Sequence, residues 1–133
     1  MLVGYRWYDK HSFAPAFPFG HGLSYGTFTY SGLVVAQRNV TFTVTRATGS
    51  GCDTPQLYLS APTASSDPAV PVKVLKHFLK VCDAVTTVQF TVTDMDVSSW
   101  DIASSKWQLV PGVWGISVGS SSADIRLQAT ITI

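Results

Sequence analysis

Residues 40–45 read Val-Thr-Phe-Thr-Val-Thr, a strict alternation of apolar and hydroxyl-bearing side chains. Successive side chains of a β-strand point to opposite faces of a sheet, so this stretch predicts a strand with one buried and one exposed face. The same period of two recurs at 57–59, 88–92, 114–118 and 125–133. None of these stretches has the period of an amphipathic helix, and together they indicate an all-β protein.

Two further segments, at about 27–36 and 72–81, bring the predicted short strands to seven. Turn-forming stretches at 48–53, 62–71 and 119–124 separate some of them, because Gly, Pro, Ser and Asp favour turns. Seven half-buried strands with no helical period predict a sandwich of two sheets.

The composition agrees with this prediction and limits the classes of function. The chain has 133 residues, which suits one domain, and 46% of them are hydrophobic. All the acidic residues are aspartates, and the lack of glutamate favours strands over helices. The net charge is only +1, so the dense basic field that nucleic acid requires is absent. No apolar run approaches the roughly 18 residues that span a bilayer.

Two stretches depart from the alternation. Residues 1–26 crowd aromatic rings among prolines and glycines, and we expect an extended segment that its rings press onto a surface. We therefore divide the chain into a junction segment at 1–26 and a domain at 27–133. The alternation also stops between Asp94 and Pro111, where we expect Trp100 and Trp107 to pin the crossover between the fifth and sixth strands. A single helical turn there has four predicted capping residues: Asp94, Asp96, Ser98 and Ser99.

The aromatic junction carries a family resemblance. YRWYD at 5–9 and FPFGHGLSY at 17–25 resemble the junction at which family 3 β-glucosidases enter their C-terminal fibronectin type III-like domain. The resemblance continues in order along nearly the whole chain, through QLYL at 56–59, VKVLKHF at 72–78, VSSWD at 97–101 and GSSSADIRL at 119–127. It implies a seven-stranded fibronectin type III-like sandwich that belongs to a glycoside hydrolase.

The sequence departs from the family pattern in three places. His77 stands where the family usually has Gly, and Cys82-Asp83-Ala84 replaces a Pro-Gly turn, which indicates a shortened turn. The family's catalytic aspartate and glutamate lie in two preceding domains, and neither domain is in this sequence. The resemblance therefore implies a non-catalytic accessory domain whose partners are those catalytic domains.

The residue types and spacings in the sequence give little support for a catalytic or metal-binding site. Retaining glycoside hydrolysis needs two carboxyl groups about 5–5.5 Å apart, and only Asp94 with Asp96, or Asp96 with Asp101, are close in sequence. Aspartates beside serines are more often caps and turns, so we assign no catalytic residue. His21 lies between two glycines and is expected to hydrogen-bond backbone in a tight turn. His11 and His77 lack neighbours at ligand spacing, so we expect no metal and no cofactor.

The two cysteines leave alternatives open: free thiols, half of a metal site, or a disulfide. In a fibronectin-like strand order, the strand after Cys52 pairs with the strand before Cys82, which favours a bridge. Asn39-Val40-Thr41 fits the N-glycosylation pattern, although it opens a strand. No charged and apolar leader follows Met1, so either an export signal lies upstream in a secreted parent, which we favour, or the chain is cytosolic.

Aromatic side chains are the remaining candidates for binding. We expect them to pack against the core or neighbouring domains; the alternative is a stand-alone module that stacks them on polysaccharide or lignin. The N-terminal rings would leave a large apolar patch in water unless the segment folds back on its own sandwich, which we favour over a dimer. The candidates for packing or stacking are Tyr5, Trp7, Tyr8, Phe17, Phe19, Tyr58, Trp100 and Trp107.

Overall fold

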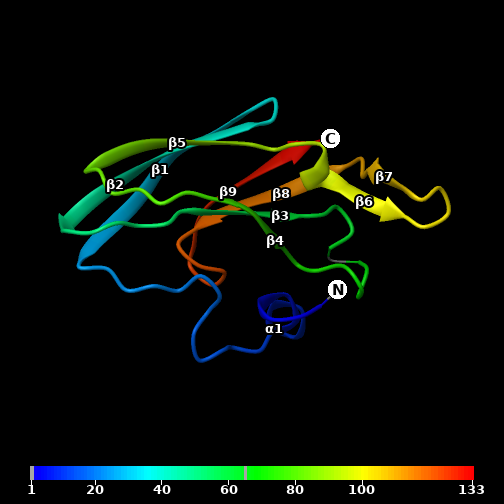
Figure 1. Ribbon diagram of the computed structural model, residues 1–133, viewed down its shortest axis with the longest axis horizontal. Helices are drawn as coiled ribbons and strands as arrows, with labels where there is room; N and C mark the ends of the chain where they lie inside the picture. The colour runs from blue at the N-terminus through cyan, green and yellow to red at the C-terminus, as the bar shows by residue number, and fades with distance from the viewer. Residues whose placement is uncertain (1, 65) are drawn as a thin grey trace.

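The computed structural model describes residues 2–64 and 66–133 and consists almost entirely of strands (Figure 1). In chain order, the elements are α1 (Tyr5–His11), β1 (Gly26–Ala36), β2 (Asn39–Gly49), β3 (Gln56–Ser60), β4 (Val74–Phe78), β5 (Val85–Thr91), the 3₁₀ turn η1 (Met95–Val97), β6 (Ser98–Asp101), β7 (Lys106–Leu109), β8 (Val113–Gly119) and β9 (Ile125–Thr132).

Seven of these strands form the predicted two-sheet sandwich. One sheet has the strand order β1-β2-β5 and the other has β4-β3-β8-β9, with every neighbouring pair antiparallel. Each of the seven segments expected from the sequence overlaps one of these strands, and the all-β fold class is confirmed.

The core lies between the two sheets, where the alternating apolar side chains meet. On β2, Val40, Phe42 and Val44 are buried while the threonines between them are only partly covered. Burying each such side chain stabilises the fold by roughly 1.5–3 kcal/mol before entropy is counted. β3 differs, because Gln56–Leu59 is buried on both faces. Its inner face meets the core, and its outer face lies beneath the N-terminal segment.

The N-terminal segment contains a helix, so the prediction of a wholly extended stretch was wrong for Tyr5–His11. The helix precedes the first proline and ends at His11; the next residue, Ser12, caps it with a left-handed φ of 56°. A seven-residue helix is unstable alone, so its stability comes from tertiary contacts. Figure 1 shows α1 beside the four-stranded sheet, below β4.

The region between β5 and β8 holds a second unpredicted element. After η1, strands β6 and β7 pair as a separate hairpin, which extends from one end of the sandwich (Figure 1). Trp100 and Trp107 face each other across it and are 49% and 53% exposed. They therefore do not pin a buried crossover. The capping prediction also failed at Asp94, which makes no side-chain cap and pairs instead with Arg38 at 3.1 Å.

Candidate domain-packing surface and cavity

A buried hydrogen-bond network fixes the end of the junction segment to β3. The Nε2 group of Gln56 donates to the carbonyl oxygens of Gly20 (3.2 Å) and Ser120 (2.7 Å), and its Oε1 accepts from the Tyr58 hydroxyl. Gly20 has a φ of +78°, and an added Cβ there would lie 2.4 Å from Gln56 Oε1. The close approach therefore requires glycine. A polar Gln in the apolar run QLYL was the sequence signal for this network.

Tyr58, which the sequence made a candidate for packing or for ligand stacking, is buried in the structure. Its relative exposure is 0%, because the junction segment covers the outer face of β3. The ring of Tyr5 meets it edge-on at 6.0 Å. Burial, followed by the proximity of Tyr5 and Asp9, raises the pKa of Tyr58 above that of a free tyrosine. Tyr58 is thus a neutral, structural hydrogen-bond donor.

Helix α1 is held to the four-stranded sheet by polar and aromatic contacts. The Tyr5 ring stacks on Phe19 at 4.6 Å, and its hydroxyl accepts the Leu75 backbone N–H at 2.8 Å. Lys73, just before β4, forms an ion pair with Asp9 at 2.6 Å, with both side chains mostly covered. Lys10 donates to the carbonyl oxygens of residues 64 and 67. The junction segment therefore folds back along its own sandwich.

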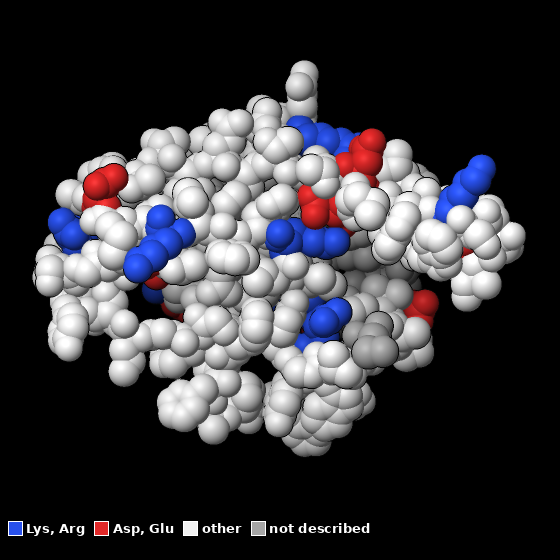
Figure 2. Space-filling model, in the orientation of Figure 1, with Lys and Arg blue, Asp and Glu red and all other residues white. Residues whose placement is uncertain are grey.

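The opposite side of this segment remains exposed to solvent. Trp7 stacks on His11 at 4.4 Å and on Phe13 at 5.5 Å, which makes a small ring cluster outside the core. Figure 2 shows uncharged side chains along the lower edge of the molecule, where Figure 1 places α1 and the chain after it. We call this surface the N-terminal aromatic face; its large exposed side chains are Trp7, Tyr8, Phe13, Phe17, Phe19, Leu23 and Tyr25.

The histidines occupy three different settings. His21 is exposed, and its backbone N–H closes a turn onto Pro18 at 3.0 Å while its ring stacks on Phe17. The predicted backbone bond is thus made by the main chain and not by the ring. His11 bonds the Trp7 carbonyl, whereas His77 bonds Asp96 at 3.0 Å. No group of three metal-binding side chains occurs among residues 2–64 and 66–133.

The aspartates suggested by sequence proximity each have separate partners. Asp94 pairs with Arg38, and Asp101 accepts from Ser104 in the turn of the β6–β7 hairpin. Asp96 accepts from the backbone N–H and hydroxyl of Thr93 and from His77. Burial alone would raise the pKa of Asp96, but these hydrogen bonds have the larger combined effect and lower the pKa. These arrangements are those of structural carboxylates.

The two cysteines are bonded to each other in the structure, with a sulfur–sulfur distance of 2.05 Å. The bridge lies next to the antiparallel contact between Asp53 and Val81, which extends the β3–β4 pairing. Asn39 is half-buried at the start of β2, and its Oδ1 accepts from Thr91 at 2.8 Å.

The exposed tryptophans of the hairpin do not form a flat platform. The ring planes of Trp100 and Trp107 cross at 74°, with their centroids 5.7 Å apart. A sugar ring stacks on one flat aromatic face, so two crossed rings do not provide a continuous stacking surface. Their geometry is that of a cross-strand aromatic pair, which stabilises a hairpin by contact.

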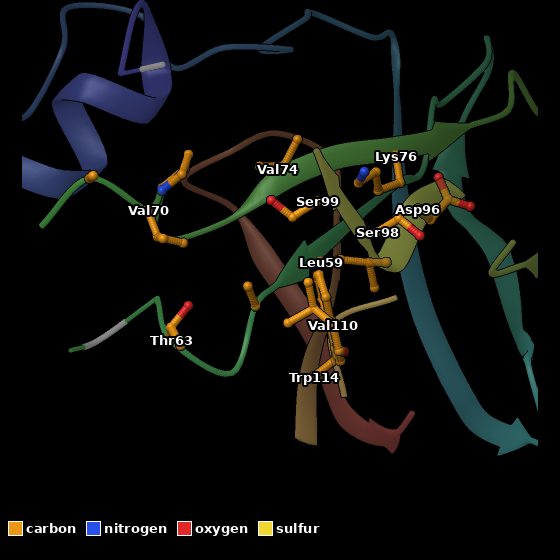
Figure 3. A pocket seen from close by; sticks show the side chains of 13 residues that line it. Leu59, Thr63, Val70, Val74, Lys76, Asp96, Ser98, Ser99, Val110 and Trp114 are labelled. Atoms are coloured by element: carbon orange, nitrogen blue, oxygen red, sulfur yellow. The ribbon is translucent and has the colours of Figure 1, made fainter. Parts of the chain in front are cut away.

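A cavity of about 340 Å³ opens at the end of the sandwich that carries η1. Its walls come from β4, the loop after β3, and the segment from η1 to β8. Figure 3 shows Lys76 and Asp96 on one side and Val110 and Trp114 on another. This cavity was not predicted from the sequence, because its lining comes from segments far apart in the chain.

Comparison with known proteins agrees with this architecture. Residues 53–122 match the family described as Fibronectin type III-like domain. The whole chain is 34% identical to Beta-glucosidase cel3A of Pyricularia oryzae, of which it covers 22%. Among solved structures, 99% of the chain superposes on a GH3 β-glucosidase from Bifidobacterium adolescentis with a TM-score of 0.89 and 32% identity, covering 21% of that enzyme. A β-glucosidase from Streptomyces venezuelae superposes with a TM-score of 0.87 and 38% sequence identity; the match covers 98% of this chain and 18% of that enzyme.

The chain thus spans about a fifth of the length of the relatives it matches. No helix among the described residues is long and apolar enough to cross a membrane. The match covers the sandwich strands and the aromatic junction together, and the chain belongs to the fibronectin type III-like domain family found in β-glucosidases of glycoside hydrolase family 3.

Proposed function

We propose that this chain is a non-catalytic accessory domain of a β-glucosidase, which packs against the catalytic domains and stabilises them in polysaccharide degradation. The N-terminal aromatic face carries the proposal. Its inner side is fixed to the sandwich by Tyr5, Asp9 and Gly20, whereas Trp7, Phe13 and Phe17 are 39%, 59% and 78% exposed. A rigidly held apolar surface of this kind is typical of an interface with another protein surface.

The domain boundaries that we propose follow from the separate roles of the aromatic face and the sandwich. Residues 1–26 form the junction that contacts the catalytic domains, and 27–133 form the sandwich that supports it. The separate partners of Asp94, Asp96 and Asp101 support a role without catalysis. The disulfide and the Asn39 sequon are consistent with a secreted parent enzyme.

The alternative function, a module that binds polysaccharide or lignin, has less support. It requires aromatic rings that are exposed and coplanar. Trp100 and Trp107 are exposed but crossed, and Tyr58 is buried. Packing of the aromatic face against a neighbouring domain accounts for the exposed rings without a ligand.

A domain replacement tests the proposal. In the Streptomyces venezuelae β-glucosidase, the region that matches this chain is deleted in one protein and exchanged for this chain in another. We expect the deletion to lower both the melting temperature and aryl-glucosidase activity, and the exchange to restore a substantial part of both. This chain alone should hydrolyse no aryl β-glucoside.

A matched pair of variants locates the contact. Trp7→Ser with Phe17→Ser should abolish the restoration, whereas Trp100→Ser with Trp107→Ser, which removes two exposed rings from the hairpin, should not. Restoration that is independent of both pairs, or a deletion without effect, would contradict the proposed interface.

A further inference from the structure

The lysine of the cavity beneath η1 comes from β4. Val74 and Lys76 lie two residues apart on this strand, and both line the cavity. In the pairing of β3 with β4, Leu57 lies opposite His77 and Tyr58 lies opposite Leu75, so Lys76 is the extra residue of a β-bulge. A bulge interrupts the alternation of side chains, and here the ring of His77 also turns toward the core, where it stacks on Phe90.

The lining divides into an apolar and a polar part. Leu59, Val70, Val74, Val110 and Trp114 contribute apolar surface. Lys76, Ser98 and Ser99 contribute a cation and two hydroxyl groups, and Figure 3 shows them between β4 and β6. Small-molecule sites combine these features in the same way, with a mainly apolar wall and a few polar groups that fix orientation.

Lys76 is the one cation among the described residues that line the cavity. Asp96 also lines it, but one of its oxygens already accepts hydrogen bonds from Thr93 and His77. Lys73 and Lys10, the other lysines near this sheet, are bound to Asp9 and to loop carbonyls. Within the described part of the chain, Lys76 has neither an ion pair nor a hydrogen bond.

We propose that this cavity is a binding site for an aromatic monocarboxylate. The carboxylate pairs with the Lys76 ammonium group and accepts from the Ser99 hydroxyl, because the Ser98 hydroxyl already donates to the Asp94 carbonyl. The aromatic ring lies against Val74, Val110 and Trp114. The volume of about 340 Å³ suits a small ligand, since drug-sized sites span roughly 300–1,000 Å³. This site is independent of the N-terminal aromatic face, and its failure would leave the proposed accessory role intact.

The test uses trans-cinnamate and its neutral amide, trans-cinnamamide, as probes in an NMR titration of the ¹⁵N-labelled chain. We expect cinnamate to bind with a dissociation constant below about 1 mM and to shift the amides of Val74, Lys76 and Ser99 and the indole of Trp114. Cinnamamide should bind about tenfold more weakly, because a hydrogen bond to a charged group contributes more than one between neutral groups.

Three variants separate the contributions. Lys76→Met keeps the length of the side chain without its charge and should weaken cinnamate about tenfold, to the affinity of cinnamamide. Lys106→Met removes an exposed lysine of the hairpin and should change neither affinity. Val70→Trp should fill the apolar part and weaken both probes.

Several results would overturn the proposal. These are the absence of binding, equal affinities for the acid and the amide, or unchanged binding to Lys76→Met. Shifts centred on the N-terminal aromatic face would equally refute this site.

Discussion

Replacing Gln56 with leucine tests whether the buried network attaches the junction to the sandwich. Gln56 is 4% exposed and makes three hydrogen bonds, to Gly20, Ser120 and Tyr58. Leucine has a similar size but no polar group. The Tyr58 hydroxyl, in a residue with 0% exposure, would then have no partner, and two carbonyl groups would each lose a donor.

The expected cost follows from these groups. A buried polar group without a partner costs about 1–3 kcal/mol, and the apolar surface of leucine offsets part of the sum. We expect the free energy of unfolding to fall by about 3 kcal/mol, a large share of the roughly 5–15 kcal/mol typical of a domain. The melting temperature should fall by roughly 10–15 °C. Circular dichroism during urea and thermal unfolding measures both quantities.

A double-mutant cycle isolates the Gln56–Tyr58 contact. Gln56→Leu with Tyr58→Phe removes the orphaned hydroxyl. The free energy of unfolding lost in the double variant should therefore be smaller, by about 1 kcal/mol or more, than the sum of the losses in the two single variants. Gln128→Leu is the matched control, because Gln128 is an exposed glutamine on β9; it should change the free energy of unfolding by less than about 0.5 kcal/mol. Additive costs, or a Gln56→Leu effect as small as that of the control, would refute the reasoning.

Three further predictions concern other contacts. Thiol titration under denaturing conditions should find no free thiol in unreduced protein; replacing Cys52 and Cys82 by alanine should cost roughly 3–4 kcal/mol, because the bridge closes a loop of 30 residues. The lowered pKa of Asp96 contributes stability that is present above its unfolded pKa, about 4. This stability is lost as the pH falls through the folded pKa. The melting temperature of Asp96→Asn should therefore fall less than that of wild type between about pH 5 and pH 2. Deleting residues 1–16 removes Tyr5, Asp9 and Lys10 and should lower the melting temperature while leaving a monomer by light scattering; an unchanged melting temperature would show that α1 does not stabilise the sandwich.

The sandwich strands were predictable because their side chains alternate between a core and a second, more exposed face. Val40, Phe42 and Val44 show this directly, since each is buried while the threonine that follows it is only half-covered. Helix α1 was not predictable in this way, because seven residues are too few for a helical period and its stabilising partners, Lys73 and Phe19, lie elsewhere in the sequence.

The features that were not predicted from the sequence share a physical cause. Tyr58 has a polar end and lies in an alternating strand, so sequence alone does not reveal that the junction covers its outer face. Strands β6 and β7 have only four residues each, and SSWD gives little apolar alternation. The bulge at Lys76 depends on the register between two strands, and the pattern of a single strand does not contain that register.

The contact between Tyr5 and Leu75 has a consequence for solubility. β4 is one of the two outermost strands of its sheet, and a bare outermost strand offers its free N–H groups to a strand of another molecule. The Tyr5 hydroxyl accepts the Leu75 N–H, and α1 lies alongside that strand. The Tyr5 side chain therefore occupies one of the backbone groups on this edge, which leaves one fewer for a strand of another molecule.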